Sequence, residues 1–92
     1  MIGLDSHPSR REGILTQRAS DTQLLLDLGS GEYYALDDVG TRVWELCDGA
    51  RRVADIVAVI SQEYDAPAAV IQADVLELLD ELAHEKLVVE SR

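Results

Sequence analysis

The side chains that could carry out chemistry are few and widely spaced in this 92-residue sequence. Its two histidines, His7 and His84, lie near opposite ends of the chain, and Cys47 is the single cysteine. A protein metal site needs several His, Cys or carboxylate ligands at close spacing, and this pattern does not supply them. The serines lack a histidine partner in any motif, and Gly29-Ser30-Gly31 is a turn rather than a phosphate-binding loop. The sequence therefore predicts no catalytic residue, no metal ligand and no cofactor, and we expect the protein not to be an enzyme.

Covalent attachment at a serine has one candidate position. An acidic, mostly helical chain of this size could be an acyl-carrier protein, which needs a modifiable serine in an Asp-Ser-Leu context at the start of a helix. The nearest sequence here is Leu4-Asp5-Ser6-His7, which has a different order and lies in the N-terminal arm. This alternative predicts that a phosphopantetheinyl transferase adds a group to Ser6, which mass spectrometry would detect.

The charge of the chain restricts its partners. Eighteen acidic residues stand against eight lysines and arginines, which gives a formal net charge of −10. Such a surface repels nucleic-acid phosphates and anionic membranes, so a cationic or neutral partner is favoured. No apolar run reaches transmembrane length and no secretory signal opens the chain. A lone cysteine cannot form an internal disulfide, so we expect a cytoplasmic protein.

Short strands occupy the first part of the predicted domain. Residues 1–12 mix Gly, Pro, Ser and charges without periodicity, which indicates a flexible N-terminal arm ahead of one domain at 13–92. Strands are predicted at 13–18, 22–28 and 32–36. The last two runs flank a Gly-Ser-Gly turn and are therefore predicted to form a hairpin.

Three helices follow the strands. Asp37 or Asp38 can cap a first helix that stops at Asp48-Gly49. Further helices are predicted at about 53–64 and 68–85, and residues 87–89 form a short closing strand or tail. The expected fold class is α+β, winged helix-turn-helix-like, with a small antiparallel three-stranded sheet followed by three helices.

The third predicted helix has two chemically distinct faces. Its apolar residues cover an arc of about 160° at 100° per residue. These residues are Ile71, Val75, Leu76, Leu78, Leu79, Leu82 and Ala83. The opposite side is acidic and comprises Asp74, Glu77, Asp80, Glu81 and Glu85. Such a face is either a plain solvated surface or a surface that attracts a basic segment lying beside the helix.

The adjacent tyrosines Tyr33 and Tyr34 must point to opposite faces of their strand. At most one of them can fill the core below the sheet. The other is either a half-buried strand aromatic or the frame of a groove in which an extended peptide docks by strand addition. The sequence leaves open which tyrosine faces such a groove.

Several segments together resemble a known family, over about residues 13–90. In order they are 24–28 (LLLDL), 31–36 (GEYYAL), 43–49 (VWELCDG), 53–57 (VADIV), 73–79 (ADVLELL) and 87–89 (LVV). This set resembles the PqqD-like family, the recognition elements for ribosomally synthesised and post-translationally modified peptides. The resemblance implies a stand-alone protein that binds the leader of a precursor peptide, with a lasso-peptide pathway as the first choice. Its implied partners are that leader and a leader peptidase or other modifying enzymes of the same pathway, and it implies no nucleic-acid or membrane partner.

The resemblance also implies where the leader binds. In the family the leader adds as a strand to the third strand, here 31–36, and lies against the third helix. The peptide-binding residues expected from this are Glu32, Tyr33, Tyr34, Ala35, Leu36, Ile71, Asp74, Val75, Leu76, Leu78 and Leu79. Among them Val75, Leu76 and Leu79 are expected to form pocket walls with one tyrosine. Asp74 and Glu77 are expected to meet basic or polar leader side chains.

A winged-helix regulator that binds DNA is the alternative function for this fold. Such a protein reads the duplex with a basic recognition helix. The third predicted helix carries five acids instead, which argues against DNA binding, and a gel shift at low salt would test it.

Overall fold

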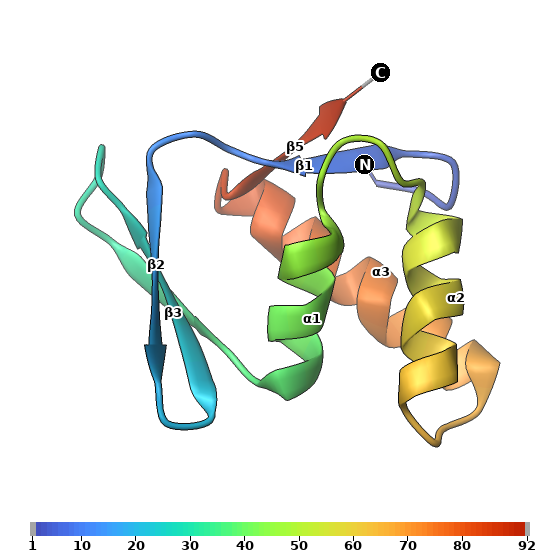
Figure 1. The fold of residues 1–92 in the computed structure, drawn as a ribbon. Coiled ribbons are helices and arrows are strands. Elements are labelled where there is room, and N and C mark those ends of the chain that lie inside the picture. Colours follow the sequence, from blue (N-terminus) through green and yellow to red (C-terminus); the bar gives the residue numbers. More distant parts are fainter. Residues whose placement is uncertain (1, 92) are drawn as a thin grey trace.

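The computed structural model describes residues 2–91, in which strands β1 to β5 and helices α1 to α3 are arranged as two small antiparallel sheets beside a helical layer (Figure 1). The strands are β1 (His7–Arg10), β2 (Ile14–Ala19), β3 (Thr22–Asp27), β4 (Tyr33–Leu36) and β5 (Val88–Ser91). The helices are α1 (Asp38–Leu46), α2 (Val53–Glu63) and α3 (Ala68–His84).

The larger sheet has the strand order β2-β3-β4. Its register places Leu25 between Thr16 on β2 and Tyr34 on β4. Gly31 has a φ of +77° in the β3–β4 turn, a backbone conformation that glycine adopts without steric cost. The predicted α+β class, with a three-stranded antiparallel sheet followed by three helices, is confirmed.

The helices begin and end close to their predicted positions. The Asp37 carboxylate caps α1 by accepting a hydrogen bond of 2.8 Å from the Gly40 backbone N–H. Proline at position 67 precedes the first turn of α3, where a missing N–H costs nothing. No helix within residues 2–91 is long and apolar enough to cross a membrane.

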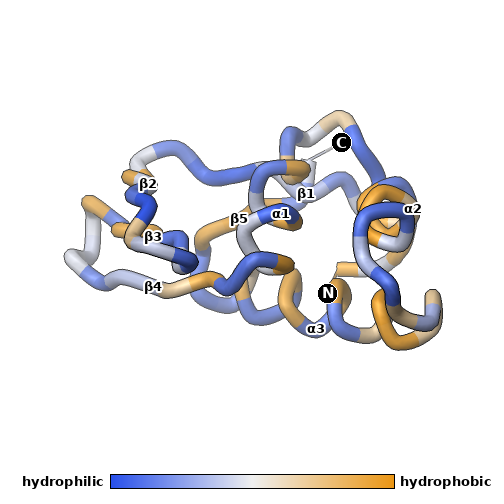
Figure 2. The backbone as a smooth tube through the Cα atoms, turned by 60° about the horizontal axis from the view of Figure 1, so that its bottom comes forward, coloured by the Kyte–Doolittle hydropathy of each residue, from blue (hydrophilic) through white to orange (hydrophobic). Residues whose placement is uncertain are grey.

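The core lies between the three helices and one face of the larger sheet. Each helix alternates hydrophobic and hydrophilic stretches along its length (Figure 2). The sheet contributes Leu25 and Leu36, which are buried against the helices. The buried helical residues include Val43, Trp44, Ile56, Ile60, Leu79 and Leu82. Cys47 is also in this core, and burial raises the pKa of its thiol to about 12.

The N-terminal segment differs from the flexible arm that the sequence predicted. Residues His7–Arg10 form β1, which pairs with β5 at the other end of the chain (Figure 1). Ile2 and Pro8 are buried, and the Leu4 and Ser6 carbonyls accept hydrogen bonds from the first turn of α2. Two buried apolar residues are too few to produce a periodic signal, and the pairing partner lies about 80 residues away, so local sequence patterns could not reveal this strand.

Candidate functional site

Strand β4 forms one edge of the larger sheet, and half of its backbone groups face away from β3. The Asp27 N–H donates to the Glu32 carbonyl at 2.8 Å, so Asp27 and Glu32 are a hydrogen-bonded pair of β3 and the segment leading into β4. Hydrogen-bonded and non-hydrogen-bonded pairs alternate in an antiparallel ladder, so Tyr34 and Leu36 bond to β3. The N–H and C=O groups of Tyr33 and Ala35 therefore point outward from the sheet edge.

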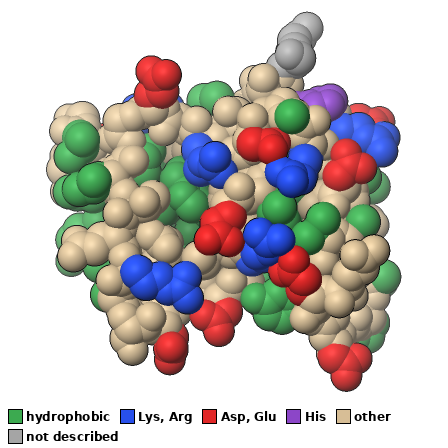
Figure 3. All heavy atoms as spheres, viewed as in Figure 1, with side chains coloured by type: hydrophobic (Ala, Val, Ile, Leu, Met, Phe, Trp, Pro, Cys, Tyr) green, Lys and Arg blue, Asp and Glu red, His purple; other side chains and the backbone are tan. Residues whose placement is uncertain are grey.

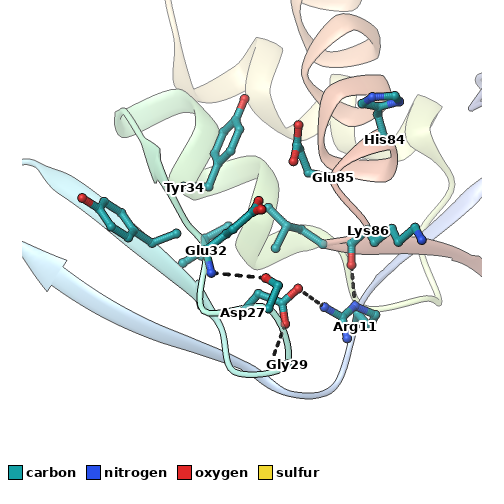
Figure 4. Close-up of a pocket in the computed structure, with 12 residues that line it drawn as sticks. Arg11, Asp27, Gly29, Glu32, Tyr34, His84, Glu85 and Lys86 are labelled. Carbon is teal, nitrogen blue, oxygen red and sulfur yellow. Dashed lines mark hydrogen bonds and ion pairs between the residues drawn. The ribbon is translucent and has the colours of Figure 1, made fainter.

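A cavity of about 500 Å³ lies between β4 and the C-terminal end of α3 (Figure 4). Glu32 and both tyrosines line it from the strand side. His84 and Glu85 line it from the helix side, and in Figure 4 Tyr34 and Glu85 stand on facing sides of it. Its remaining lining residues are Arg11, Leu25, Asp27, Gly29, Ser30, Lys86 and Leu87. The hollow thus continues from the open strand edge onto the helix.

Tyr34 is the tyrosine that reaches α3. Its hydroxyl donates a hydrogen bond of 2.6 Å to the Glu81 carboxylate. This bond, together with burial and the charges of Glu81 and Glu85, raises the pKa of Tyr34 to about 12. Tyr33 projects from the other face of the sheet and is 75% exposed. Tyr34 is therefore the tyrosine that faces α3.

One end of the cavity is held by an ion pair. The Asp27 carboxylate accepts hydrogen bonds from the Gly29 N–H at 2.9 Å and from the Arg11 guanidinium at 2.6 Å. The backbone bond from Gly29 and the bond from Arg11 lower the pKa of Asp27. Arg11 also donates to the Lys86 carbonyl just after α3. This network ties the hairpin turn to the end of the helix and fixes the width of the cavity there.

The exposed side of α3 next to Tyr34 is negatively charged. Glu77, Asp80, Glu81, His84 and Glu85 line a second hollow of about 490 Å³ with Tyr34. Within residues 2–91 none of these four carboxylates forms an ion pair. Among the described residues, the helix side of the groove therefore carries four carboxylates without an ion-pair partner, and Lys86 lines the cavity just after the helix.

The outer face of the larger sheet, which points away from the helices, carries no charge. By the pairing register it comprises Leu15, Gln17 and Ala19 of β2, Thr22, Leu24 and Leu26 of β3, and Tyr33 and Ala35 of β4. Leu15 is 52% exposed, and no element within residues 2–91 covers this face. Hydrophobic side chains gather at the left edge of Figure 3, over the strands.

The strand residues predicted for the site lie around the groove, with one exception. Glu32, Tyr33 and Tyr34 line the cavity, although the Tyr33 side chain projects from the outer face of the sheet, and Ala35 offers its backbone at the edge. Leu36, also predicted, is 3% exposed and belongs to the core. Its side chain points to the same face as Leu25, beneath the sheet.

Most of the predicted helix residues do not line the groove. Val75 and Leu79, expected as pocket walls, are buried in the core, and so is Ile71. Leu76 and Leu78 are partly buried against that core. Asp74 is exposed but lines neither hollow. The reason is that the centre of the apolar arc packs on the helical core, so only its acidic border faces β4.

Sequence reasoning missed the residues at the ends of elements. His84, Lys86 and Leu87 line the cavity from the C-terminal end of α3, and Arg11 lines it from the segment before β2. The sequence placed Glu81 and Glu85 on the acidic face of the helix but predicted no contact of either residue with the peptide. Glu77, Glu81 and Glu85 follow one another at intervals of four residues, which places all three on one side of the helix, and this spacing is a signal that could have suggested them.

The two arginines before β2 bind their own chain. Arg10 donates to the carbonyls of Trp44 at 2.9 Å and Glu45 at 2.7 Å, which are near the C-terminal end of α1. Arg11 is occupied by Asp27 and Lys86 as described above. Both side chains therefore stabilise the fold, because cations favour the carbonyls at helix C-termini.

A small α+β domain with an open sheet edge beside an acidic helix is the class of protein that these features define. Residues 22–88 match the family model described as "Coenzyme PQQ synthesis protein D (PqqD)". The chain belongs to the PqqD family, which confirms the resemblance found in its sequence.

The relatives of this chain match almost its whole length. A "PqqA binding protein" of Xanthomonas axonopodis pv. citri (strain 306) is 40% identical over 88 residues, 94% of each chain. The solved structure of TbiB1 in complex with the TbiA(beta) leader peptide is 30% identical with a TM-score of 0.77, covering 87% of this chain and 93% of that one. The PqqD truncation of Methylobacterium extorquens PqqCD, described as a functional and stand-alone RiPP recognition element, is 28% identical with a TM-score of 0.79. That match covers 97% of this chain and 95% of the other.

Proposed function

We propose that this protein binds the leader region of a ribosomally synthesised precursor peptide and delivers the peptide to modifying enzymes or a leader peptidase. The observation that carries the proposal is the open edge of β4 beside the cavity at α3. The relatives support it, since one is named for binding PqqA and TbiB1 was solved with a leader peptide. The role requires no catalytic group in this chain.

The leader binds as a fourth strand of the larger sheet. The outward N–H and C=O groups of Tyr33 and Ala35 pair with its backbone, which supplies affinity with little demand on sequence. Side chains that enter the cavity supply specificity. Tethering the precursor near an enzyme raises its local concentration without new catalytic contacts. Protein and precursor meet in the cytoplasm in this proposal, where Cys47 stays reduced.

Two types of leader are candidates for the natural ligand. The sequence resemblance favours a lasso-type leader, whereas the curated relative at 40% identity is named for PqqA. A leader encoded next to this gene, a lasso leader and a PqqA peptide should therefore be compared by calorimetric titration. Saturable one-to-one binding of one of them, lost when its sequence is scrambled, is the expected result. If none of the three binds, the proposal is wrong.

A proline substitution tests the docking edge directly. Ala35→Pro removes an N–H that points out of the sheet, and proline is tolerated at edge strands whose N–H faces solvent. Thr16→Pro on β2, the opposite edge strand, is the matched control. The Leu28 N–H donates to the Gly13 carbonyl, so the hydrogen-bonded and non-hydrogen-bonded pairs of β2 and β3 alternate from that pair. The Thr16 N–H therefore also points out of the sheet. We expect Ala35→Pro to weaken leader binding about tenfold, the equivalent of one lost hydrogen bond of about 1.4 kcal/mol. Equal affinities for the two variants would place the leader elsewhere.

A further inference from the structure

We propose that the docked peptide is recognised on both faces, so that its residues follow a two-residue pattern. Residues that project over the outer face of the sheet are uncharged and apolar. The intervening residues project toward α3 and include lysine or arginine. This inference rests on the proposed function and specifies the chemistry of the peptide that the same site selects.

The geometry of strand addition sets the pattern. Successive side chains of a strand point to opposite faces of the sheet. In a strand paired with β4, one set of side chains lies beside Tyr33 and Ala35 on the outer face. The other set lies beside Tyr34, whose hydroxyl already contacts Glu81 on α3. Paired side chains on one face lie about 5 Å apart, so each set meets its own surface.

The outer face selects against charge. Tyr33 is the exposed end of a row that continues through Leu26 to Leu15 across the three strands. None of the outer-face positions of the sheet carries a charge, although 28% of the chain is charged. An apolar side chain on the added strand would cover Tyr33 and extend this row. A charged side chain there would lose water without gaining a partner, which is unfavourable.

The α3 side selects for positive charge. Glu77, Glu81 and Glu85 lie on successive turns of the helix, with Asp80 beside them, and none of them has a basic partner within residues 2–91. Acidic residues on an exposed helix are often only a solvated surface. These carboxylates differ because they line a hollow next to an open strand edge, and Tyr34 joins the edge strand to Glu81. A peptide ammonium or guanidinium placed there gains a Coulomb attraction, whereas a carboxylate is repelled.

A substitution scan of the bound leader tests the pattern. Each position of the leader that binds in the titration above is replaced in turn by lysine and, separately, by aspartate. We expect lysine to weaken binding at least about tenfold at every second position, a cost of roughly 1.4 kcal/mol. At the intervening positions lysine should leave the affinity unchanged or raise it. Aspartate should weaken binding at both sets of positions.

Variants of the protein test each face separately. Tyr33→Glu should weaken leader binding, and Leu15→Glu is its matched control because Leu15 lies on the same face but on the far edge strand. Glu77→Lys combined with Glu85→Lys should reverse the scan, so that aspartate becomes the tolerated residue at the α3-facing positions. Asp65→Lys, an equal change of charge per site in the exposed loop before α3, should leave the scan unchanged.

The outcomes separate this inference from the proposed function. Leader binding in which the lysine scan shows no two-residue period overturns the pattern and leaves leader binding intact. The pattern is also wrong if aspartate is favoured over lysine at the α3-facing positions of the unmodified protein. Absence of binding by every leader overturns both the inference and the proposed function.

Discussion

At the scale of single residues, strand geometry gives two adjacent tyrosines different roles. Tyr34 crosses from β4 to Glu81 on α3, and Tyr33 extends the uncharged outer face of the sheet. The leucines of α3 also differ in burial: Leu79 and Leu82 are buried in the core, whereas Leu76 and Leu78 are only partly buried. Leu79 is fully buried, although its place on a wide apolar arc made it a candidate for the groove wall. The role of each residue therefore depends on which part of the molecule its side chain points toward.

Truncation of Leu79 should destabilise the fold rather than abolish binding alone. We expect Leu79→Ala to lower the free energy of unfolding by about 2–5 kcal/mol, since it leaves a cavity in the core. Urea denaturation followed by circular dichroism measures this change. Val70→Ala on the same helix is the control, because Val70 is 50% exposed and its truncation should have a small effect. Similar midpoints for the two variants would mean that Leu79 is not a core residue.

The hydrogen bond from Tyr34 to Glu81 should make stability depend on pH. The pKa of Tyr34 is about 12 in the folded protein, above its ordinary value of 10.0, so the folded state holds this proton more tightly than the unfolded state. The stabilisation is therefore fully present below pH 10 and is lost as the pH rises toward 12. Urea denaturation of the wild type and Tyr34→Phe should show a stability difference that shrinks over this range. Tyr33→Phe is the control, and a Tyr34→Phe difference that is constant with pH would contradict the prediction.

At the scale of elements, the pairing of β1 with β5 closes the domain. The Arg10 N–H and the Gly49 N–H make backbone hydrogen bonds that join β1 to the end of α1. Arg11, immediately after β1, reaches both Asp27 and the end of α3. The segment before β2 thus positions the groove from outside it, because it holds the hairpin turn against the helix.

Removal of residues 1–10 should destabilise the whole domain. The truncation deletes β1, uncovers Val88 and loses the buried side chains of Ile2 and Pro8. We expect a loss of at least about 2 kcal/mol in the free energy of unfolding, the value of one or two buried apolar side chains. Urea denaturation provides the measurement, with Leu4→Ala as a control at an exposed position of the same segment. An unchanged midpoint would restore the flexible arm that the sequence predicted.

At the scale of the whole molecule, the charge distribution matches a peptide ligand better than a nucleic acid. The net charge is −10, and the exposed face of α3 carries carboxylates without basic partners within residues 2–91. In a winged-helix regulator the corresponding surface would have to neutralise phosphates. The same charge favours a basic segment in the groove and disfavours a second acidic chain beside it.

We expect no complex with duplex DNA even at low salt. Nucleic-acid affinity comes largely from lysine and arginine that displace condensed counterions, and this protein presents acids instead. A gel shift with mixed-sequence duplex DNA at low ionic strength tests the expectation, with leader binding by the same preparation as proof that the protein is active. A tight complex that weakens as salt is added would support a DNA-binding regulator.

Much of the local structure could be predicted from sequence because it depends on short-range rules. The period of the apolar residues and an aspartate cap at position 37 or 38 indicated α1, and the Gly-Ser-Gly turn indicated the β3–β4 hairpin. The ordered segments between residues 24 and 89 indicated the family. The outward edge at 31–36 was also expected, since the family resemblance placed the docking strand there.

Tertiary structure alone decided which surfaces face the groove. The pairing of β1 with β5 joins segments about 80 residues apart, and no local pattern encodes such a contact. The directions of Tyr33 and Tyr34 follow from the register with β3, in which a shift of one residue would exchange them. The rotation of α3 buries Val75 and Leu79 and turns Glu81 and Glu85 toward β4, because the helix packs its apolar arc on α1 and α2. Helical periodicity determines which residues share a face, but only packing against the rest of the molecule determines where that face points.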